Sequence, residues 1–143
     1  IGAVTYLLDT CVVSELIARH PHPDVVRWVD RVDEDMLFLS VITIGEVQRG
    51  VARIHDSPRK RELQAWLQDD LLVRFGERIL PIDVEVMLPW GELAARLDHQ
   101  GRRMPAMDSV IAATCLGRGL TLVTRNVGGF LHSGVEVLNP WPQ

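Results

Sequence analysis

The sequence predicts an α/β protein with a mainly parallel sheet of about five strands flanked by helices. Short β-prone apolar runs alternate along the chain with segments of helical periodicity. Asp, Ser or Thr stands at the start of most helical segments. Apolar residues make up 47% of the 143 positions, enough for a substantial core. Strands that alternate with helices are typical of a parallel sheet.

Each predicted strand is a run of about five residues, mostly Val, Leu, Ile, Phe or Tyr, bounded by polar or turn residues. The almost unbroken apolar character of residues 36–40 predicts a strand that is buried on both faces. The expected strands are residues 4–8, 36–40, 78–82, 120–124 and 134–138.

The first three predicted helices begin at side chains that accept hydrogen bonds from free backbone N–H groups. Asp9 and Thr10 are suited to cap the first helix, and Asp24 the second. Thr43 is suited to cap the third, which would then carry Glu46 in its first turn. These helices are expected to end near residues 17, 32 and 54.

The later helices are marked by Gly and Pro as well as by periodicity. A helix over residues 57–75 is expected to stop at Gly76, where glycine favours a helix end. Asp83 is suited to cap the next helix, in which Pro89 predicts a kink or a restart before residue 99. Pro105 suits the first turn of a helix that runs to about residue 117.

Length and composition predict one domain over residues 1–143. The net charge of −4 argues against broad electrostatic binding of nucleic acid, although it allows a local basic rim. Cys11 and Cys115 lack metal-ligand spacing and fit a reducing compartment. No signal peptide is visible and no apolar run is long enough to span a bilayer, so we expect a cytoplasmic protein without a membrane partner.

Four oxygen-bearing side chains follow strand ends or open helices in this scheme. Asp9 ends the first strand, Glu46 lies shortly beyond the second, and Asn126 follows the fourth. Asp108 lies in the first turn of the helix before the fourth strand, where the helix dipole favours a negative charge. Because ligands of parallel sheets bind at the carboxyl ends of the strands, we expect these four side chains to meet.

Three carboxylates and an amide are hard oxygen ligands, which suit Mg²⁺ or Mn²⁺ rather than zinc. Without a cation, three anions in one cleft would raise one another's pKa. A divalent ion can bind a phosphodiester oxygen and lower the pKa of a water. The residues therefore point to metal-dependent phosphoryl or phosphodiester hydrolysis. The alternative is that each acid at a strand end is only a helix cap.

Four ordered segments carry a family resemblance. They are LLDTCVVSEL at residues 7–16, SVITIGEVQRG at 40–50, DSVIAAT at 108–114 and TRN at 124–126. The chain resembles PIN-domain proteins in these segments, most of all the toxin subunits of the VapC and FitB type. With the closing residues 139–141, the similarity extends over essentially the whole chain.

This resemblance implies a three-layer PIN-like sandwich and a Mg²⁺- or Mn²⁺-dependent ribonuclease. It also implies a homodimer that a cognate VapB-like antitoxin holds inactive, and a toxin–antitoxin complex that binds operator DNA. The family's metal-binding acids correspond to Asp9, Glu46 and Asp108, and its fourth catalytic position corresponds to Asn126.

Two positions depart from the family pattern. Many relatives have Asp at position 126, or Asn with a second Asp three residues later, where this chain has Gly129. Cys11 replaces the usual Asn after Asp-Thr, which removes an amide that would orient the Asp9 loop. We therefore expect one well-occupied metal position rather than two.

Hydroxyl groups near the acids are candidates for orienting them, as metal-bound carboxylates usually require. For Thr10 and Thr43 we favour helix capping instead. For Ser14 and Thr124 both interpretations stay open.

Charged and aromatic side chains offer further candidates. Arg125, beside Asn126, is the preferred substrate contact, whereas residues 59–61 are interpreted as a solvated basic face. Glu15 is expected to pair with a basic residue such as Arg49, or to lie around the site without ligating the ion. Trp141 is expected to pack the tail onto the domain or a dimer mate.

Two other functions remain open. With a weakened fourth ligand, the protein would act only as an antitoxin partner in an operator-binding complex. A small-molecule phosphohydrolase on a related scaffold is the second alternative, although the chain lacks a Gly-rich phosphate loop and an Asp-x-Asp pair. Its histidines have no zinc-ligand spacing.

Overall fold

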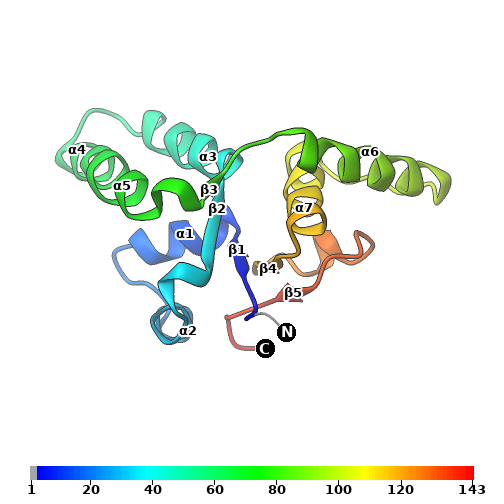
Figure 1. Ribbon diagram of the computed structural model, residues 1–143. Coiled ribbons are helices and arrows are strands. Elements are labelled where there is room, and N and C mark those ends of the chain that lie inside the picture. Colours follow the sequence, from blue (N-terminus) through cyan, green and yellow to red (C-terminus); the bar gives the residue numbers. More distant parts are fainter. Residues whose placement is uncertain (1–2) are drawn as a thin grey trace.

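Five short parallel strands form the centre of the computed structural model, which describes residues 3–143 (Figure 1). The first two residues of the predicted 1–143 domain lie outside this range. The spatial order of the strands is β3-β2-β1-β4-β5, and every neighbouring pair is parallel. The strands are β1 (Tyr6–Leu8), β2 (Leu37–Ser40), β3 (Ile79–Leu80), β4 (Thr121–Val123) and β5 (Val137–Leu138). All five predicted strands are present, each shorter than predicted.

Helices connect the strands and cover the sheet. They are α1 (Thr10–Ile17), α2 (Pro23–Arg31), α3 (Val41–Ala52), α4 (Pro58–Ala65), α5 (Leu72–Phe75), α6 (Val84–His99) and α7 (Ala106–Arg118). Short 3-10 turns add η1 (Glu34–Met36), η3 (Gly76–Arg78) and η4 (Gly128–Phe130). The predicted helix over residues 57–75 is α4 and α5 joined by a π-helical segment, η2 (Trp66–Leu71).

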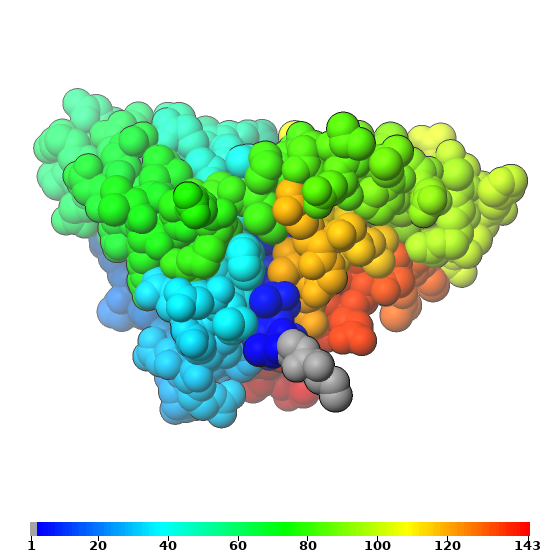
Figure 2. All heavy atoms as spheres, viewed as in Figure 1, coloured from blue at the N-terminus to red at the C-terminus, as the bar shows by residue number. Residues whose placement is uncertain are grey.

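Alternating strand residues bury their side chains in two separate cores. Leu8, Leu39 and Val123 pack with α1, α2, α3 and the α4–α5 segment on one face of the sheet. Leu7 and Leu122 pack with α6 and α7 on the other face. The result is a helix–sheet–helix sandwich in which α6 and α7 form an arm that extends to one side (Figures 1 and 2). The predicted three-layer α/β fold is confirmed.

The caps of two helices differ from the prediction. The imidazole of His22 accepts from the Asp24 N–H, so His22 rather than Asp24 caps α2. Ser40 caps α3 through a hydrogen bond from the Ile42 N–H, whereas Thr43 is buried inside the helix. Because α3 begins at Val41, Glu46 lies in its second turn rather than its first.

One continuous helix, α6, spans Pro89, where a kink or restart was expected. Proline has no N–H, so the carbonyl of Glu85 one turn earlier receives no helical hydrogen bond from it. This carbonyl lies against Gly117 of α7, where an added Cβ would be only 2.4 Å from the oxygen. Glycine at position 117 therefore permits the close approach of α6 and α7.

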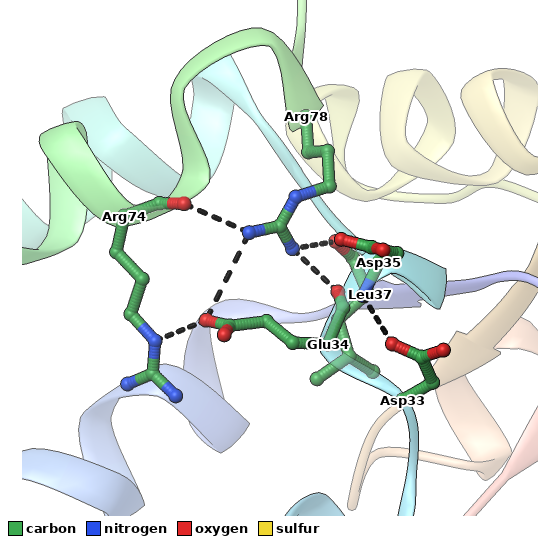
Figure 3. Close-up of polar contacts among 6 residues, drawn as sticks. All are labelled: Asp33, Glu34, Asp35, Leu37, Arg74 and Arg78. Atoms are coloured by element: carbon green, nitrogen blue, oxygen red, sulfur yellow. Dashed lines mark hydrogen bonds and ion pairs between the residues drawn. The ribbon is translucent and has the colours of Figure 1, made fainter.

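Arg78 ties the starts of β2 and β3 together. Its guanidinium donates to the carbonyl oxygens of Glu34, Leu37 and Arg74 at 2.5 to 2.8 Å (Figure 3). The Glu34 carboxylate pairs with the side chains of both Arg74 and Arg78. These contacts fix the start of β2 against the turn that leads into β3. Within residues 3–143, no helix combines the length and apolar character needed to cross a membrane.

Candidate active site

The candidate site lies where the chain direction reverses across the sheet. From β1 the chain builds outward through β2 to β3, then returns through α6 and α7 to place β4 on the other side of β1. In open parallel sheets, the carboxyl ends of the two strands at such a reversal form a crevice between the diverging connections. Asp9 follows β1 at this point, and Thr124 follows β4.

Asp9 is held by hydrogen bonds at both carboxylate oxygens. Its Oδ1 accepts from the Thr10 N–H at 2.9 Å, so Asp9 caps α1 as predicted. Its Oδ2 accepts from the Thr124 hydroxyl at 2.8 Å. Thr124 is fully buried. The Thr124 hydroxyl is therefore in contact with Asp9, as the orienting role left open for it requires.

Glu46 is held from α1 rather than from its own helix. The Thr10 hydroxyl donates to Glu46 Oε1 at 2.5 Å, and the Thr43 hydroxyl lies 3.2 Å from that of Thr10. The preference for Thr10 and Thr43 as simple caps is therefore wrong. The exposed side chain of Ser14 makes no hydrogen bond among the described residues, although it shares a groove of about 160 Å³ with Glu46. A hydroxyl-bearing residue directly after an acid at a strand end is the sequence signal that could have identified Thr10 as a supporting residue.

Asp108 lies in the first turn of α7, where Pro105 is the N-cap residue and provides no side-chain cap. Burial raises the pKa of the Asp108 carboxyl, and the charges of Asp9 and Glu46 raise it further. Burial likewise raises the pKa of Asp9, opposed by the hydrogen bonds from Thr124 and Thr10 and reinforced by the Glu46 charge. Three acids from distant segments thus share one electrostatic environment.

The donor chemistry fits a hard divalent cation. The three carboxylates supply only oxygen, and a cation would remove the repulsion that raises the pKa values of Asp9 and Asp108. In residues 3–143, no three His, Cys, Asp or Glu side chains lie close enough together to hold an ion by themselves.

Asn126 turns toward the following loop. Its side-chain Oδ1 accepts from the Gly129 backbone N–H at 3.2 Å, and its backbone N–H donates to the Thr124 hydroxyl at 3.0 Å. A Cβ at position 129 would be 2.4 Å from Asn126 Nδ2. The amide therefore fills the space that a side chain at Gly129 would need.

Cys11 occupies the space between the ends of β1 and β4. Its Sγ lies 3.5 Å from the Thr124 hydroxyl and accepts from the Arg125 N–H at 3.5 Å. It also lies 4.0 Å from Asp9 Oδ2. The thiol thus connects the two strand ends.

The remaining basic candidates differ in what their side chains contact. Arg59 and Lys60 donate to backbone carbonyls at the ends of α1 and α3, and Arg61 pairs with Asp56, so this segment does more than form a solvated face. Arg125 is exposed, and its guanidinium lies 5.5 Å from the ring centroid of Trp141.

Glu15 does not pair with Arg49. Its carboxylate accepts from the Trp141 indole N–H at 3.1 Å and from the His22 N–H at 3.4 Å. The expected packing of Trp141 onto the domain is confirmed, with 5% of its surface exposed. No periodicity or motif signalled the link between Glu15 and Trp141, because 126 residues separate them.

Known proteins resemble this chain over most of its length. A family model described as the PIN domain matches residues 6–131. Toxin FitB of Neisseria gonorrhoeae is 36% identical over 94% of this chain and 97% of its own length. A VapC ribonuclease of Sinorhizobium fredii is 32% identical over 94% of this chain and 96% of its own.

Two solved structures have the same fold as this chain over nearly its whole length. The crystal structure titled FitAcB from Neisseria gonorrhoeae superposes with a TM-score of 0.91 at 35% identity, covering 97% of this chain and 100% of that one. A structure titled FitAB bound to a DNA fragment also gives 0.91, at 34% identity and 97% of each chain.

Proposed function

The chain belongs to the PIN-domain family, and from this membership and the site we propose that it is a metal-dependent endoribonuclease, the toxin of a type II toxin–antitoxin pair. The observation that carries the proposal is that Thr10, directly after Asp9, holds Glu46 at the strand reversal, where the charges of both acids also act on Asp108. Partly buried acids such as Asp9 and Asp108, whose charges repel one another, are costly to a fold, and such sites are commonly functional. The names of the relatives, toxin FitB and a VapC ribonuclease, support the same activity.

Asp9, Glu46 and Asp108 would hold Mg²⁺ or Mn²⁺, directly or through water, and Asn126 would assist. When bound, the cation supplies Lewis acidity that lowers the pKa of a water and offsets charge on the phosphodiester. The chain's own residues set the geometry: Thr124 fixes Asp9, and Thr10 fixes Glu46. We assign no separate general base, because the three carboxylates can orient a water and accept its proton.

The partners follow from the relatives' assemblies. We propose a cognate VapB-like antitoxin as the inhibitor, and operator DNA as a ligand of the toxin–antitoxin complex only. Titles of the similar structures, which name a two-component complex and one bound to DNA, support this. A homodimer and a cytoplasmic location complete the proposal.

Cleavage of a labelled single-stranded RNA in Mn²⁺, with and without chelator, tests the activity. Asp9→Asn and Asp108→Asn should each abolish Mn²⁺-stimulated cleavage while circular dichroism stays unchanged. Asp56→Asn, an exposed acid that pairs with Arg61 away from the site, should cleave like the wild type. Full activity in the double variant would reject this site, and hydrolysis of p-nitrophenyl phosphate without RNA cleavage would favour a phosphohydrolase.

The second candidate is a weakly active or inactive PIN module that works with its antitoxin on operator DNA. It is favoured by the Asn126 amide, which accepts from the Gly129 N–H and adds no charge to the site. Asn126→Asp separates the two. A lower Mn²⁺ requirement and faster cleavage would indicate a nuclease with a weakened ligand. No cleavage by either form, together with intact antitoxin binding, would indicate the module.

A further inference from the structure

Arg125 extends from the floor of the candidate site. It follows Thr124, whose hydroxyl holds Asp9, and its backbone N–H donates to Cys11 Sγ at 3.5 Å. Its backbone position is therefore tied to both strand ends that build the site. Its side chain is exposed.

The guanidinium of Arg125 is placed by an aromatic face rather than by an acid. It lies over the Trp141 ring, 5.5 Å from the centroid, within the range of a cation–π contact. Within residues 3–143, no carboxylate lies within ion-pair distance of it, in contrast to Arg74, Arg78 and Arg118. A contact through the face leaves the N–H groups at the guanidinium edge free to bind another group.

Trp141 is itself fixed at both ends. Its indole N–H donates to Glu15 Oε1 at 3.1 Å, and its backbone N–H donates to Asn139 Oδ1 at 2.9 Å. Glu15 lies on α1, the helix that Asp9 caps. The last residues of the chain are thereby fastened to the helix that leaves the site, and the ring presented to Arg125 is immobilised.

Resting on the proposed ribonuclease function, we propose that Arg125 binds an RNA backbone phosphate beside the one that is cut, and that Trp141 positions it for this contact. A planar guanidinium with free edge donors suits two phosphate oxygens. The need for such a cation follows from the site, because three acids repel an incoming RNA backbone. The C-terminal tail is then part of the substrate-binding surface.

Affinity for RNA tests the arginine directly. A fluorescein-labelled single-stranded RNA of mixed sequence is titrated in Mg²⁺ against Asp108→Asn protein, which should leave the RNA uncut. Adding Arg125→Ala should weaken binding about tenfold, the scale of one charged hydrogen bond. It should also lower the slope of log affinity against log salt by about 0.7, the value for one phosphate contact on a single strand. Arg61→Ala, which removes an arginine paired with Asp56, should change neither quantity.

The role of Trp141 is tested by replacing its side chain with a smaller aromatic ring and, separately, with an aliphatic group. Trp141→Phe keeps an aromatic face but loses the bond to Glu15, so it should lower the melting temperature while binding RNA within about twofold of the parent. Trp141→Leu should weaken binding several-fold. In an Arg125→Ala background, Trp141→Leu should cause no further loss, because its effect passes through the arginine.

Four results would overturn the inference in whole or in part. Unchanged affinity and salt slope in Arg125→Ala would remove the phosphate contact and leave the nuclease proposal standing. Additive losses from Trp141→Leu and Arg125→Ala would limit Trp141 to a structural role. Weaker binding of the cognate antitoxin with unchanged RNA binding would make Arg125 a protein contact. If neither the wild type nor the Asp108→Asn parent binds or cuts the RNA in Mg²⁺, both this inference and the ribonuclease proposal are wrong.

Discussion

The hydroxyl of Thr124 donates to Oδ2 of Asp9 at 2.8 Å, joining the carboxyl ends of β4 and β1 across 115 residues of sequence. Because Thr124 is fully buried, no water competes for this bond. The bond therefore fixes one oxygen of Asp9 to the buried end of β4.

We expect Thr124→Val to reduce RNA cleavage by about 10- to 100-fold, the usual cost of removing a group that orients a metal-binding side chain. Valine keeps the shape of threonine, so the fold should remain while Asp9 loses its orientation. The measurements are the rate of RNA cleavage and the Mn²⁺ concentration at half-maximal rate. Thr124→Ser keeps the hydroxyl and should retain most activity, and equal losses in both variants would contradict this role.

Thr10 is predicted to act on Glu46 in the same way. Thr10→Val removes the hydroxyl that donates to Glu46 Oε1, and the Mn²⁺ concentration at half-maximal rate should rise about tenfold. Ser14→Ala removes an exposed hydroxyl from the same helix and should change this concentration little. A similar rise in both variants would show that hydroxyl groups on α1 act without the Glu46 contact.

The sequence was sufficient for the fold, and it placed Asp9 at a strand end and Asp108 in the first turn of a helix, as the structure does. Alternating strands and helices predicted the parallel sheet, because periodicity is a local property that burial imposes on each element. Asp9 and Asp108 were found because a strand end and a helix start are visible as short patterns. Where local signals competed, the prediction failed: Ser40 and Thr43 are both good caps, and only the packing of Thr43 into the core selected Ser40.

The contacts that complete the site were not predictable from local patterns. Thr10 was interpreted as a cap because its position suits one, yet its hydroxyl contacts Glu46, 36 residues away. The bond between Glu15 and Trp141 joins the two ends of the chain and depends on the sheet order. Such pairs are set by tertiary structure, so they required the three-dimensional arrangement of β1, β4 and the tail.

Replacement of Asp108 is predicted to stabilise the protein at neutral pH while abolishing activity. Burial and the charges of Asp9 and Glu46 raise its folded-state pKa above the ordinary value of 3.8, so the folded protein holds the proton more tightly than the unfolded chain. The destabilisation is absent below pH 3.8 and grows as the pH rises through the folded pKa. An exposed charge interaction is worth up to about 1 kcal/mol, so Asp108→Asn should raise the melting temperature by about 1–3 °C in chelator at pH 7.

The dependence on pH and on metal provides the control. The difference between wild type and Asp108→Asn should shrink as the pH falls below 3.8, because the carboxyl then becomes protonated in both states. Adding Mg²⁺ should raise the melting temperature of the wild type more than that of Asp108→Asn, because an ion that binds only the folded state stabilises it. A variant that melts below the wild type at pH 7 in chelator would contradict the assigned repulsion.

The packing of α6 against α7 gives a prediction about stability alone. An added Cβ at Gly117 would be 2.4 Å from the Glu85 carbonyl and 3.0 Å from a ring carbon of Pro89. Gly117→Ala must therefore push the two helices apart, and we expect a loss of about 1–3 kcal/mol in the free energy of unfolding. Chemical denaturation monitored by circular dichroism measures this change.

Gly91→Ala is the matched control, because position 91 lies inside α6 with no heavy atom within 4 Å of an added Cβ. Alanine there should stabilise the protein by about 0.5–1 kcal/mol through its lower conformational entropy. Opposite signs at the two positions would show that the free carbonyl opposite Pro89 sets the distance between α6 and α7. Stabilisation by both substitutions would mean that the helices separate at little cost, and that glycine at position 117 is not required for packing.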